Sequence, residues 1–435
     1  MLNIPIFKLI YGAYFSIEND RKFSIVTRKI CLAIERISNH SGGAEKVVVT
    51  LANGLNEAGF DVSIITWEHQ DGLPFYPLDK QVEVINLMPI DRRRPPGQSQ
   101  KITFKKRLIR MFLKAGTWPY FIPGYSKFIW NRQHKFRLQE MRRHFNEAKP
   151  DVVIGFLPSS FPYVVRAADG LDVKAVSSCH SVPERDFEDP DRWSQNVYDL
   201  KWRKKSLLHS DATTCLLDKF TPFFEKMSVP NLHVIPNFVE TPNGKHLEFS
   251  RDSKTIIAVG RLALAKDHQT LLHAWAYIKD DYPDWKIHIY GTGPLRDALH
   301  DLHAQLGLGE TLVFKGETKD VEEKYQEAEI FCIPSIYEGF GLVTGEAMAN
   351  GLPVIGFDDC DGTNDLVIDG VTGILSKGSG DRSKNLANDL ARLMSDQDKR
   401  REMGREGFDS IKRFSKDAAM AKWFKMLDSI GAGRI

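Results

Sequence analysis

Residues 334–351 read PSIYEGFGLVTGEAMANG and form the most informative stretch of the chain. They follow a short apolar run typical of a buried strand and open a helical pattern. Glu338 precedes the predicted helix and Glu346 lies about a turn inside it, while Gly339 and Gly341 let consecutive backbone amides face a ligand. Amides at a helix N-terminus bind phosphate, and carboxylates accept hydrogen bonds from sugar hydroxyls. Alternatively, Glu338 only complements the helix dipole and Glu346 is an ordinary exposed residue.

On both sides of this loop, β-rich runs alternate with helical stretches, which is typical of parallel sheets covered by helices. The chain has 435 residues, too many for one hydrophobic core. The fold class that we expect is α/β, with two facing doubly wound Rossmann-like domains and an interdomain cleft. The strands are expected at 29–35, 61–66, 82–86, 151–155, 173–178, 211–216, 232–235, 255–260, 285–290, 311–315, 329–333, 353–356 and 373–375.

The polar, turn-rich residues 241–245 predict a linker between the two domains. We expect four parts: an N-terminal extension without an assigned role, two Rossmann-like domains and a C-terminal helix that packs back on the first domain. These parts are residues 1–27, 28–240, 246–415 and 416–435.

Two further strand-to-helix loops contain residue types that bind anions. Ser41-Gly42-Gly43-Ala44-Glu45 precedes a helical pattern, and its paired glycines let amides approach a phosphate or an acceptor sugar. A tight turn is the alternative for a glycine pair alone. Arg261 and Lys266 follow the strand 255–260 and can converge on a diphosphate, although two cations in a loop are often merely solvated.

The composition excludes several classes of protein. Hydrophobic residues make up 42% of the chain and charged residues 27%, close to the averages of globular proteins. The five cysteines are scattered, without the spacing of a zinc site or a disulfide framework, and we interpret them as reduced, which favours the cytoplasm. The sequence has neither a run long and apolar enough to span a bilayer nor the pattern of a secretory signal.

In combination, these motifs resemble the retaining glycosyltransferases of family 4, which have the GT-B fold and an E-x7-E signature. The resemblance covers roughly residues 28–425 in order. Besides the loops already quoted, it includes Cys179-His180, Ile235-Pro236-Asn237, Tyr290-Gly291-Thr292-Gly293-Pro294 and Lys315-Gly316. One departure is Gly345, which stands where a larger apolar residue is more common and which suggests close packing.

The resemblance implies a role for each domain and for each matching residue. The N-terminal domain would bind the acceptor and the C-terminal domain the nucleotide sugar. Arg261 and Lys266 would neutralise the diphosphate of a nucleotide-sugar donor, and Glu346 would bind the ribose. Glu338 and His180 would lie beside the transferred sugar. The remaining donor-binding positions implied in this way are Gly43, Lys315, Gly339, Phe340, Gly341 and Leu342. No metal and no other cofactor is implied, and we interpret Asp359-Cys360-Asp361, which resembles a metal-binding Asp-x-Asp triplet, as a coincidence.

Residues 92–143 carry 15 Lys and Arg against the single acid Glu140, together with many aromatic residues, of which Tyr125, Phe128 and Trp130 are three. Residues 104–114 predict a basic amphipathic helix that lies on an anionic membrane surface. The alternatives are an inserted helical pair whose charges are solvated and, with less support, nucleic-acid binding. The basic segment favours a lipid-linked acceptor.

The sequence therefore predicts a metal-independent hexosyltransferase on the inner face of the cell membrane. It would transfer a sugar, with a UDP-sugar as the expected donor, to a lipid-linked or saccharide acceptor of a surface glycan, without nucleic acid as a partner. A nucleotide-sugar epimerase of similar fold and a non-catalytic sugar-binding scaffold are the alternatives. A dinucleotide oxidoreductase is disfavoured, because residues 291–296 lack the third glycine of its phosphate-binding loop.

Overall fold

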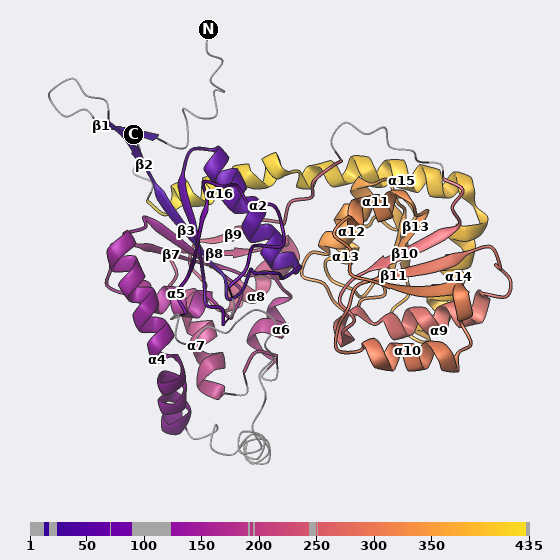
Figure 1. Ribbon diagram of the computed structural model, residues 1–435, viewed down its shortest axis with the longest axis horizontal. Coiled ribbons are helices and arrows are strands. Elements are labelled where there is room, and N and C mark those ends of the chain that lie inside the picture. Colours follow the sequence, from indigo (N-terminus) through magenta and orange to yellow (C-terminus); the bar gives the residue numbers. More distant parts are fainter. Residues whose placement is uncertain are drawn as a thin grey trace, which may run out of the picture. The chain divides into compact units, whose positions relative to one another are not determined.

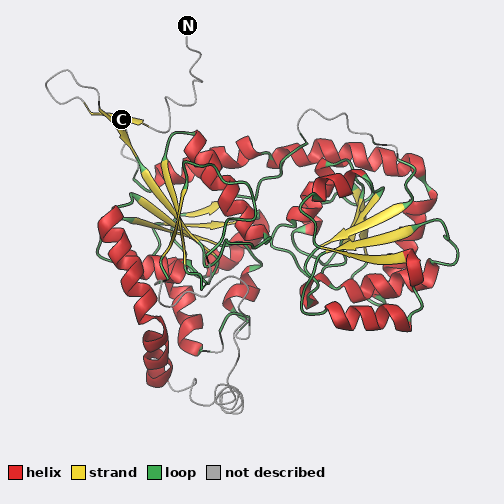
Figure 2. Cartoon of the chain, in the orientation of Figure 1, coloured by secondary structure: helices red, strands yellow, loops and turns green. Residues whose placement is uncertain are grey.

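A computed structural model describes residues 13–16, 24–69, 71–88, 123–189, 192–194, 196–242, 249 and 251–431. The chain divides into two compact units (Figures 1 and 2). The N-terminal domain comprises Met1–Ile235 and Met420–Ile435, and the C-terminal domain comprises Pro236–Ala419. The division at Ile235 and Pro236 lies just before the turn-rich residues 241–245.

The N-terminal domain is built around a seven-stranded parallel sheet of order β5-β4-β3-β6-β7-β8-β9. Its strands are β3 (Lys29–Ala33), β4 (Asp61–Thr66), β5 (Glu83–Asn86), β6 (Val152–Phe156), β7 (Lys174–Ser178), β8 (Ala212–Cys215) and β9 (Leu232–Val234). β6 is buried along its whole length, as expected for the centre of a sheet covered on both faces. A separate antiparallel pair, β1 (Ala13–Ser16) and β2 (Ser24–Thr27), precedes the sheet and was not predicted.

Helices cover both faces of this sheet (Figure 1). On one face, α4, α5 and α7 form a core with the strands around Phe145, Val153 and Val164. On the other face, α2 and the last part of α16 supply Leu51 and Trp423. The helices of this domain are α2 (Gly43–Glu57), α4 (Pro123–Ala148), α5 (Phe161–Ala168), α6 (Pro183–Phe187), α7 (Val197–Leu208), η3 (Asp218–Phe220), α8 (Thr221–Lys226) and, shared with the other domain, α16 (Lys416–Ser429).

The last part of α16 belongs to the N-terminal domain through specific contacts. The Phe424 ring stacks on Phe60 with centroids 6.2 Å apart, and Trp423 contacts Phe156 at 6.3 Å. Both side chains are almost completely buried. The C-terminal end of the chain therefore completes the core that its N-terminal end begins.

The C-terminal domain contains a six-stranded parallel sheet of order β12-β11-β10-β13-β14-β15. Numbered from the first strand of the domain this is 3-2-1-4-5-6, the Rossmann order, and the N-terminal sheet repeats it with one added strand. The strands are β10 (Thr255–Val259), β11 (Lys286–Tyr290), β12 (Leu312–Gly316), β13 (Ile330–Cys332), β14 (Val354–Phe357) and β15 (Gly373–Ser376). Two parallel Rossmann-like sheets were predicted, and this prediction is confirmed.

Figure 1 shows α9 and α10 on one side of this sheet and α12 and α15 on the other. Trp275 of α9 and Leu390 of α14 are buried in the main core of the domain. The helices of the domain are η4 (Leu264–Lys266), α9 (His268–Ile278), α10 (Arg296–Gln305), η5 (Gly309–Thr311), α11 (Val321–Gln326), α12 (Leu342–Ala349), α13 (Thr363–Leu366), α14 (Arg382–Ser395), α15 (Gln397–Ile411) and η6 (Lys412–Phe414).

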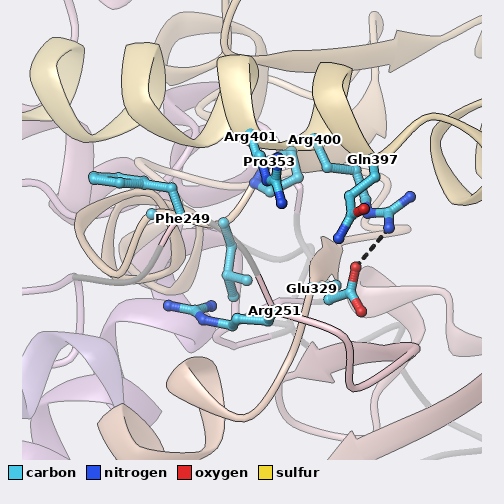
Figure 3. Close-up of a pocket in the computed structure, with 9 residues that line it drawn as sticks. Phe249, Arg251, Glu329, Pro353, Gln397, Arg400 and Arg401 are labelled. Atoms are coloured by element: carbon cyan, nitrogen blue, oxygen red, sulfur yellow. Dashed lines mark ion pairs between the residues drawn. The ribbon is translucent and has the colours of Figure 1, made fainter.

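A buried ion pair joins α15 to the start of β13. Arg400 Nη2 lies 2.7 Å from Glu329 Oε2, and the two side chains are only 9% and 4% exposed. Figure 3 shows them pointing toward each other beside a cavity of about 10 Å³, which holds at most one water molecule. This cavity is a packing seam and not a ligand site.

The structure corrects one prediction about the basic segment 92–143, and another prediction falls on residues that the structure does not describe. Trp130 was grouped with the membrane-facing aromatics, but its side chain is 1% exposed and stacks on Tyr163 at 5.7 Å in the domain core. The amphipathic helix predicted at 104–114 lies outside the described residues. Within the part of the chain that the structure describes, no helix combines the length and apolarity needed to cross a bilayer.

Candidate functional site

The candidate site of the C-terminal domain lies where the strand order reverses. In an open parallel sheet, ligands bind at the carboxyl ends of the strands on either side of this point. Here those strands are β10 and β13, which pair directly. The loop after β10 contains Arg261 and Lys266, and the loop after β13 contains Glu338. The topology therefore brings together two of the three loops singled out in the sequence.

An ion pair connects these two loops. Lys266 Nζ lies 2.5 Å from Glu338 Oε1, and their side chains are 24% and 11% exposed. Ser335 Oγ donates to the same carboxylate oxygen at 2.7 Å, and the backbone N–H of Ile336 donates to the carbonyl of Ala265 at 2.9 Å. The lysine is thus held at a fixed place by a partly buried carboxylate, in reach of an incoming anion.

The N-terminus of α12 completes this arrangement. Gly341 is its N-cap residue with φ +80°, a left-handed conformation that glycine adopts without strain. Phe340 is buried and its ring meets Phe414 edge-on at 5.2 Å, which fixes the loop just before the helix. Leu342 begins the helix, so the amides of this turn have no intrahelical acceptor. They provide a partial positive charge beside Lys266.

Glu346 lies one turn inside α12, as the sequence predicted. The hydroxyl of Tyr325, a buried residue of α11, donates to Glu346 Oε2 at 3.3 Å. This contact holds the Glu346 carboxylate in place from α11, a helix for which the sequence predicts no functional residue. Gly345, its neighbour, packs closely against the first residues of the same domain: a Cβ added there would lie 2.6 Å from Val239 Cγ2.

The Gly291-Thr292-Gly293 motif supports the Arg261 loop. Leu262 N–H donates to the carbonyl of Thr292 at 3.0 Å, and a Cβ at Gly291 would lie 2.0 Å from the carbonyl oxygen of Gly260. Only glycine permits this close approach. Arg261 itself is exposed near the start of this loop, and Lys315 is exposed on β12.

Asp359-Cys360-Asp361 has a structural explanation within this domain. Asp359 Oδ2 pairs with Arg382 at 2.7 Å, and the backbone carbonyl of Asp361 accepts a hydrogen bond from Glu338 N–H at 3.1 Å. The Cys360 thiol is buried, which raises its pKa to about 12. Asp361 and Ser335 thus both position Glu338. Ser335 lies within the motif 334–351, so the sequence offers a signal for it, whereas Asp361 acts through its backbone carbonyl and leaves no sequence signal.

The two remaining predicted residues belong to the N-terminal domain. His180 follows β7, where its Nε2 lies 2.8 Å from Ser178 Oγ and its ring stacks on Phe156 at 5.1 Å. Gly43 is the first residue of α2 and is exposed. Two residues later, burial raises the pKa of Glu45.

Comparison with known proteins identifies the family to which both halves of the chain are similar. The profile described as "Glycosyltransferase Family 4" matches residues 41–242, and the one described as "Glycosyl transferases group 1" matches residues 241–409. An uncharacterized glycosyltransferase of Haemophilus influenzae is 25% identical over 78% of this chain and 83% of its own length.

Two further similarities cover nearly the whole chain. The Campylobacter jejuni GalNAc-alpha-(1->4)-GalNAc-alpha-(1->3)-diNAcBac-PP-undecaprenol alpha-1,4-N-acetyl-D-galactosaminyltransferase is 25% identical over 90% of this chain and 96% of its own length. A crystal structure of mutant S. aureus TarM with fondaparinux, alpha-GlcNAc-glycerol and UDP superposes with a TM-score of 0.69, at 13% identity, over 92% of this chain and all of that one. With both halves matched by these profiles and the fold shared, the chain belongs to the GT-B glycosyltransferases of the family 4 type.

Proposed function

We propose that this glycosyltransferase transfers a sugar from a UDP-sugar, with retention of configuration and without a metal ion, to an acceptor in surface-glycan synthesis. The observation that carries this proposal is the Lys266–Glu338 pair beside the N-terminus of α12, at the strand-order reversal. A cation, helix amides and a carboxylate within one site match the needs of a sugar diphosphate.

The chemistry follows from the charges of this site. During transfer the bond between the anomeric carbon and the diphosphate breaks, and a bond to the acceptor oxygen forms on the same face of the sugar. The acceptor proton leaves with the departing diphosphate. Negative charge grows on that diphosphate, so Lys266, Arg261 and the amides from Phe340 to Leu342 stabilise the transition state electrostatically. Fixed protein charges take the place that a metal ion has in other transferases.

The other donor contacts extend from this centre. Glu346, held by Tyr325, would accept hydrogen bonds from the ribose hydroxyls. Glu338 would lie beside the transferred sugar, and the backbone around Lys315 and Gly316 would meet the base. The roles of His180 and Gly43 rest on the family resemblance alone.

The choice of donor base and acceptor draws on the relatives. TarM was crystallised with UDP, and the C. jejuni relative is named for an undecaprenol-linked glycan acceptor. We extend both to this chain: a UDP-sugar as donor and a lipid-linked or oligosaccharide acceptor.

A thermal-shift screen with UDP, GDP and ADP tests the donor assignment. A ligand that binds only the folded protein raises its stability by RT ln(1 + [L]/Kd), which is about 2.7 kcal/mol at a hundredfold excess over Kd. UDP is expected to raise Tm, and Lys266→Ala should reduce the shift. If none of the three nucleotides shifts Tm, the donor site is misassigned. Turnover of the donor without any acceptor would instead favour an epimerase.

Peripheral attachment to a membrane is a second part of the proposal, and it rests on the described start of α4. Tyr125 is 43% and Phe128 58% exposed, and Lys127, Arg132 and Lys135 are exposed beside them. Aromatic rings at headgroup depth with lysines and arginines toward lipid phosphates give an interfacial helix its affinity.

Co-sedimentation with liposomes tests this attachment. The protein should bind vesicles containing anionic lipid at low salt and be released at high salt. Phe128→Ala with Lys127→Ala should weaken binding, whereas Tyr277→Ala, an exposed aromatic residue of the other domain, serves as the control. Equal binding of all variants, or no binding to anionic vesicles, would contradict the proposal.

A further inference from the structure

The N-terminal domain contains a pocket that the donor chemistry does not use. Its volume is about 520 Å³, within the range of small-molecule sites. Glu35 follows β3, Trp67 follows β4 and Ser159 follows β6, so the pocket lies at the carboxyl ends of these strands. β3 and β6 are the pair at which the strand order of this sheet reverses. The pocket thus occupies the place in its own sheet that the Lys266–Glu338 site occupies in the other.

The lining includes the aromatic side chains of Trp67, Phe136, Tyr163 and Trp193, and several of them are held by polar contacts. Trp193 Nε1 donates to Asp186 Oδ1 at 2.9 Å, and the Tyr163 hydroxyl lies 3.2 Å from His134 Nδ1. The rings of Trp67 and Phe136 meet edge-on at 6.3 Å. The walls are therefore preorganised, which lowers the entropic cost of binding a ligand.

The charges of the pocket argue against a phosphate ligand. Arg137 is the one arginine or lysine among the described lining residues. Its Nη2 pairs with Glu35 Oε1 at 3.1 Å, its Nη1 donates to the carbonyl of Ser159 at 3.2 Å, and its guanidinium lies over the rings of Trp67 and Tyr163. Asp199 adds a further acid to the lining, and its Oδ2 pairs with the buried Arg203 at 3.0 Å. A diphosphate would therefore meet a guanidinium that Glu35 already neutralises and that the rings of Trp67 and Tyr163 cover.

The same lining suits a neutral sugar ring. The slightly positive C–H groups of a pyranose pack against the negative faces of aromatic rings. Glu35 Oε1 is occupied by Arg137, while no described residue donates to Oε2, so this oxygen can accept from a hydroxyl. Gln133 and Ser194 add uncharged polar groups to the lining.

We infer that this pocket binds the terminal sugar of the acceptor, so that the enzyme extends an existing glycan and does not add the first sugar to a lipid phosphate. This inference rests on the proposed function, because it assigns the second substrate of the same reaction. The acceptor phosphates, if present, lie outside this pocket.

Ligand-observed saturation-transfer NMR on the full chain tests this inference. The probes are the methyl glycosides of glucose, galactose, mannose, N-acetylglucosamine and N-acetylgalactosamine, with farnesyl phosphate as the lipid-phosphate probe. At least one glycoside should receive saturation, and UDP should not displace it. Saturation of farnesyl phosphate alone, or displacement of every glycoside by UDP, overturns the inference.

Two phenylalanines of α4 provide a matched pair of variants. Phe136 lines the pocket, whereas Phe128 lies on the same helix, is 58% exposed and does not line it. Phe136→Ala should weaken glycoside binding roughly tenfold, and Phe128→Ala should leave it unchanged. Glu35→Gln, which preserves the shape of the side chain, should also weaken it. Tm measured for each variant identifies a folding defect, and equal binding by all three folded variants overturns the inference.

The two proposals fail in different ways. If UDP causes no thermal shift but a glycoside binds in a manner that depends on Phe136, the donor assignment falls and the sugar pocket stands. If UDP binds but no glycoside of the panel is saturated, the donor site stands and the pocket assignment falls.

Discussion

The two domains have the same strand order but assemble their sites from different material. In the C-terminal domain, two short strand-to-helix loops contribute Lys266 and Glu338, and the N-terminus of α12 adds backbone amides. In the N-terminal domain, the pocket lining extends from Glu35 to Asp199 and is aromatic and nearly neutral. In our proposals, one strand order therefore accommodates a charged and an uncharged ligand, and the loops decide which.

The largest effect is expected from the ion pair of the C-terminal site. Lys266→Ala and Glu338→Ala should each lower kcat/KM by a factor of about 10² to 10³, because they remove or misplace a charge that stabilises the departing diphosphate. Steady-state kinetics with donor and acceptor measure this. Lys384→Ala, an exposed lysine of the same domain, is the control. Near-normal turnover of Lys266→Ala would show that the cationic site lies elsewhere.

The next effect concerns the stability of the C-terminal domain. Arg400→Met leaves the buried Glu329 without its cation and should cost about 3–5 kcal/mol. Amide hydrogen exchange resolves the two domains: the protected amides of β10 and β13 should exchange faster, and those of β3 and β6 should not. A second change, Glu329→Gln, should restore part of the loss. Equal acceleration in both domains would mean that they unfold together.

Acid should weaken each domain through one buried histidine. Burial lowers the pKa of His134 and of His268 to about 4, from an ordinary value of about 6.5, with a smaller contribution from Arg137 and Lys266 respectively. At pH values between the folded-state and the ordinary pKa, the unfolded chain binds more protons than the folded one, so the free energy of unfolding decreases as pH falls. At pH 5 the loss is about 2 kcal/mol for each histidine. In the N-terminal domain, burial raises the pKa of Asp186 to about 6, so the folded form binds a proton there more readily than the unfolded chain and offsets part of this loss.

Urea unfolding at pH 7 and pH 5, with the two domains resolved by hydrogen exchange, measures this loss. His268→Leu should reduce the pH dependence of the C-terminal domain and leave that of the N-terminal domain intact. A C-terminal domain that remains equally sensitive in the variant would contradict the assignment.

The smallest effect is expected at Gly345. A Cβ at this position would lie 2.6 Å from Val239 Cγ2, so Gly345→Ala should destabilise the domain by about 1 kcal/mol after the gain in helix propensity is counted. Thermal unfolding of the single variant and of Gly345→Ala with Val239→Ala measures it. The double variant should recover stability relative to the sum of the two single changes, and simple additivity would mean that Val239 is not the obstacle.

The sequence predicts the C-terminal site better than the N-terminal pocket for a physical reason. Strands from β3 onward lie within one or two residues of the predicted ranges, because apolar periodicity and turns mark them. Lys266 and Glu338 follow two such strands, and the Rossmann order makes those strands neighbours. Trp67, Arg137 and Trp193 carry no motif, since they come from a strand end, a helix and a loop that only the tertiary fold brings together. Trp130 was misplaced because an aromatic residue among cations reads equally well as membrane-facing or as core.

The contribution of α16 to the N-terminal domain has a consequence for how the protein is made. On the ribosome the N-terminal half emerges first, and domains generally fold in the order in which they are synthesised. Here Phe60 and Phe156 pack against Phe424 and Trp423, which are translated only after the whole C-terminal domain. The domain that is synthesised first therefore completes its core last, and an incomplete chain leaves these apolar residues open to chaperones and proteases.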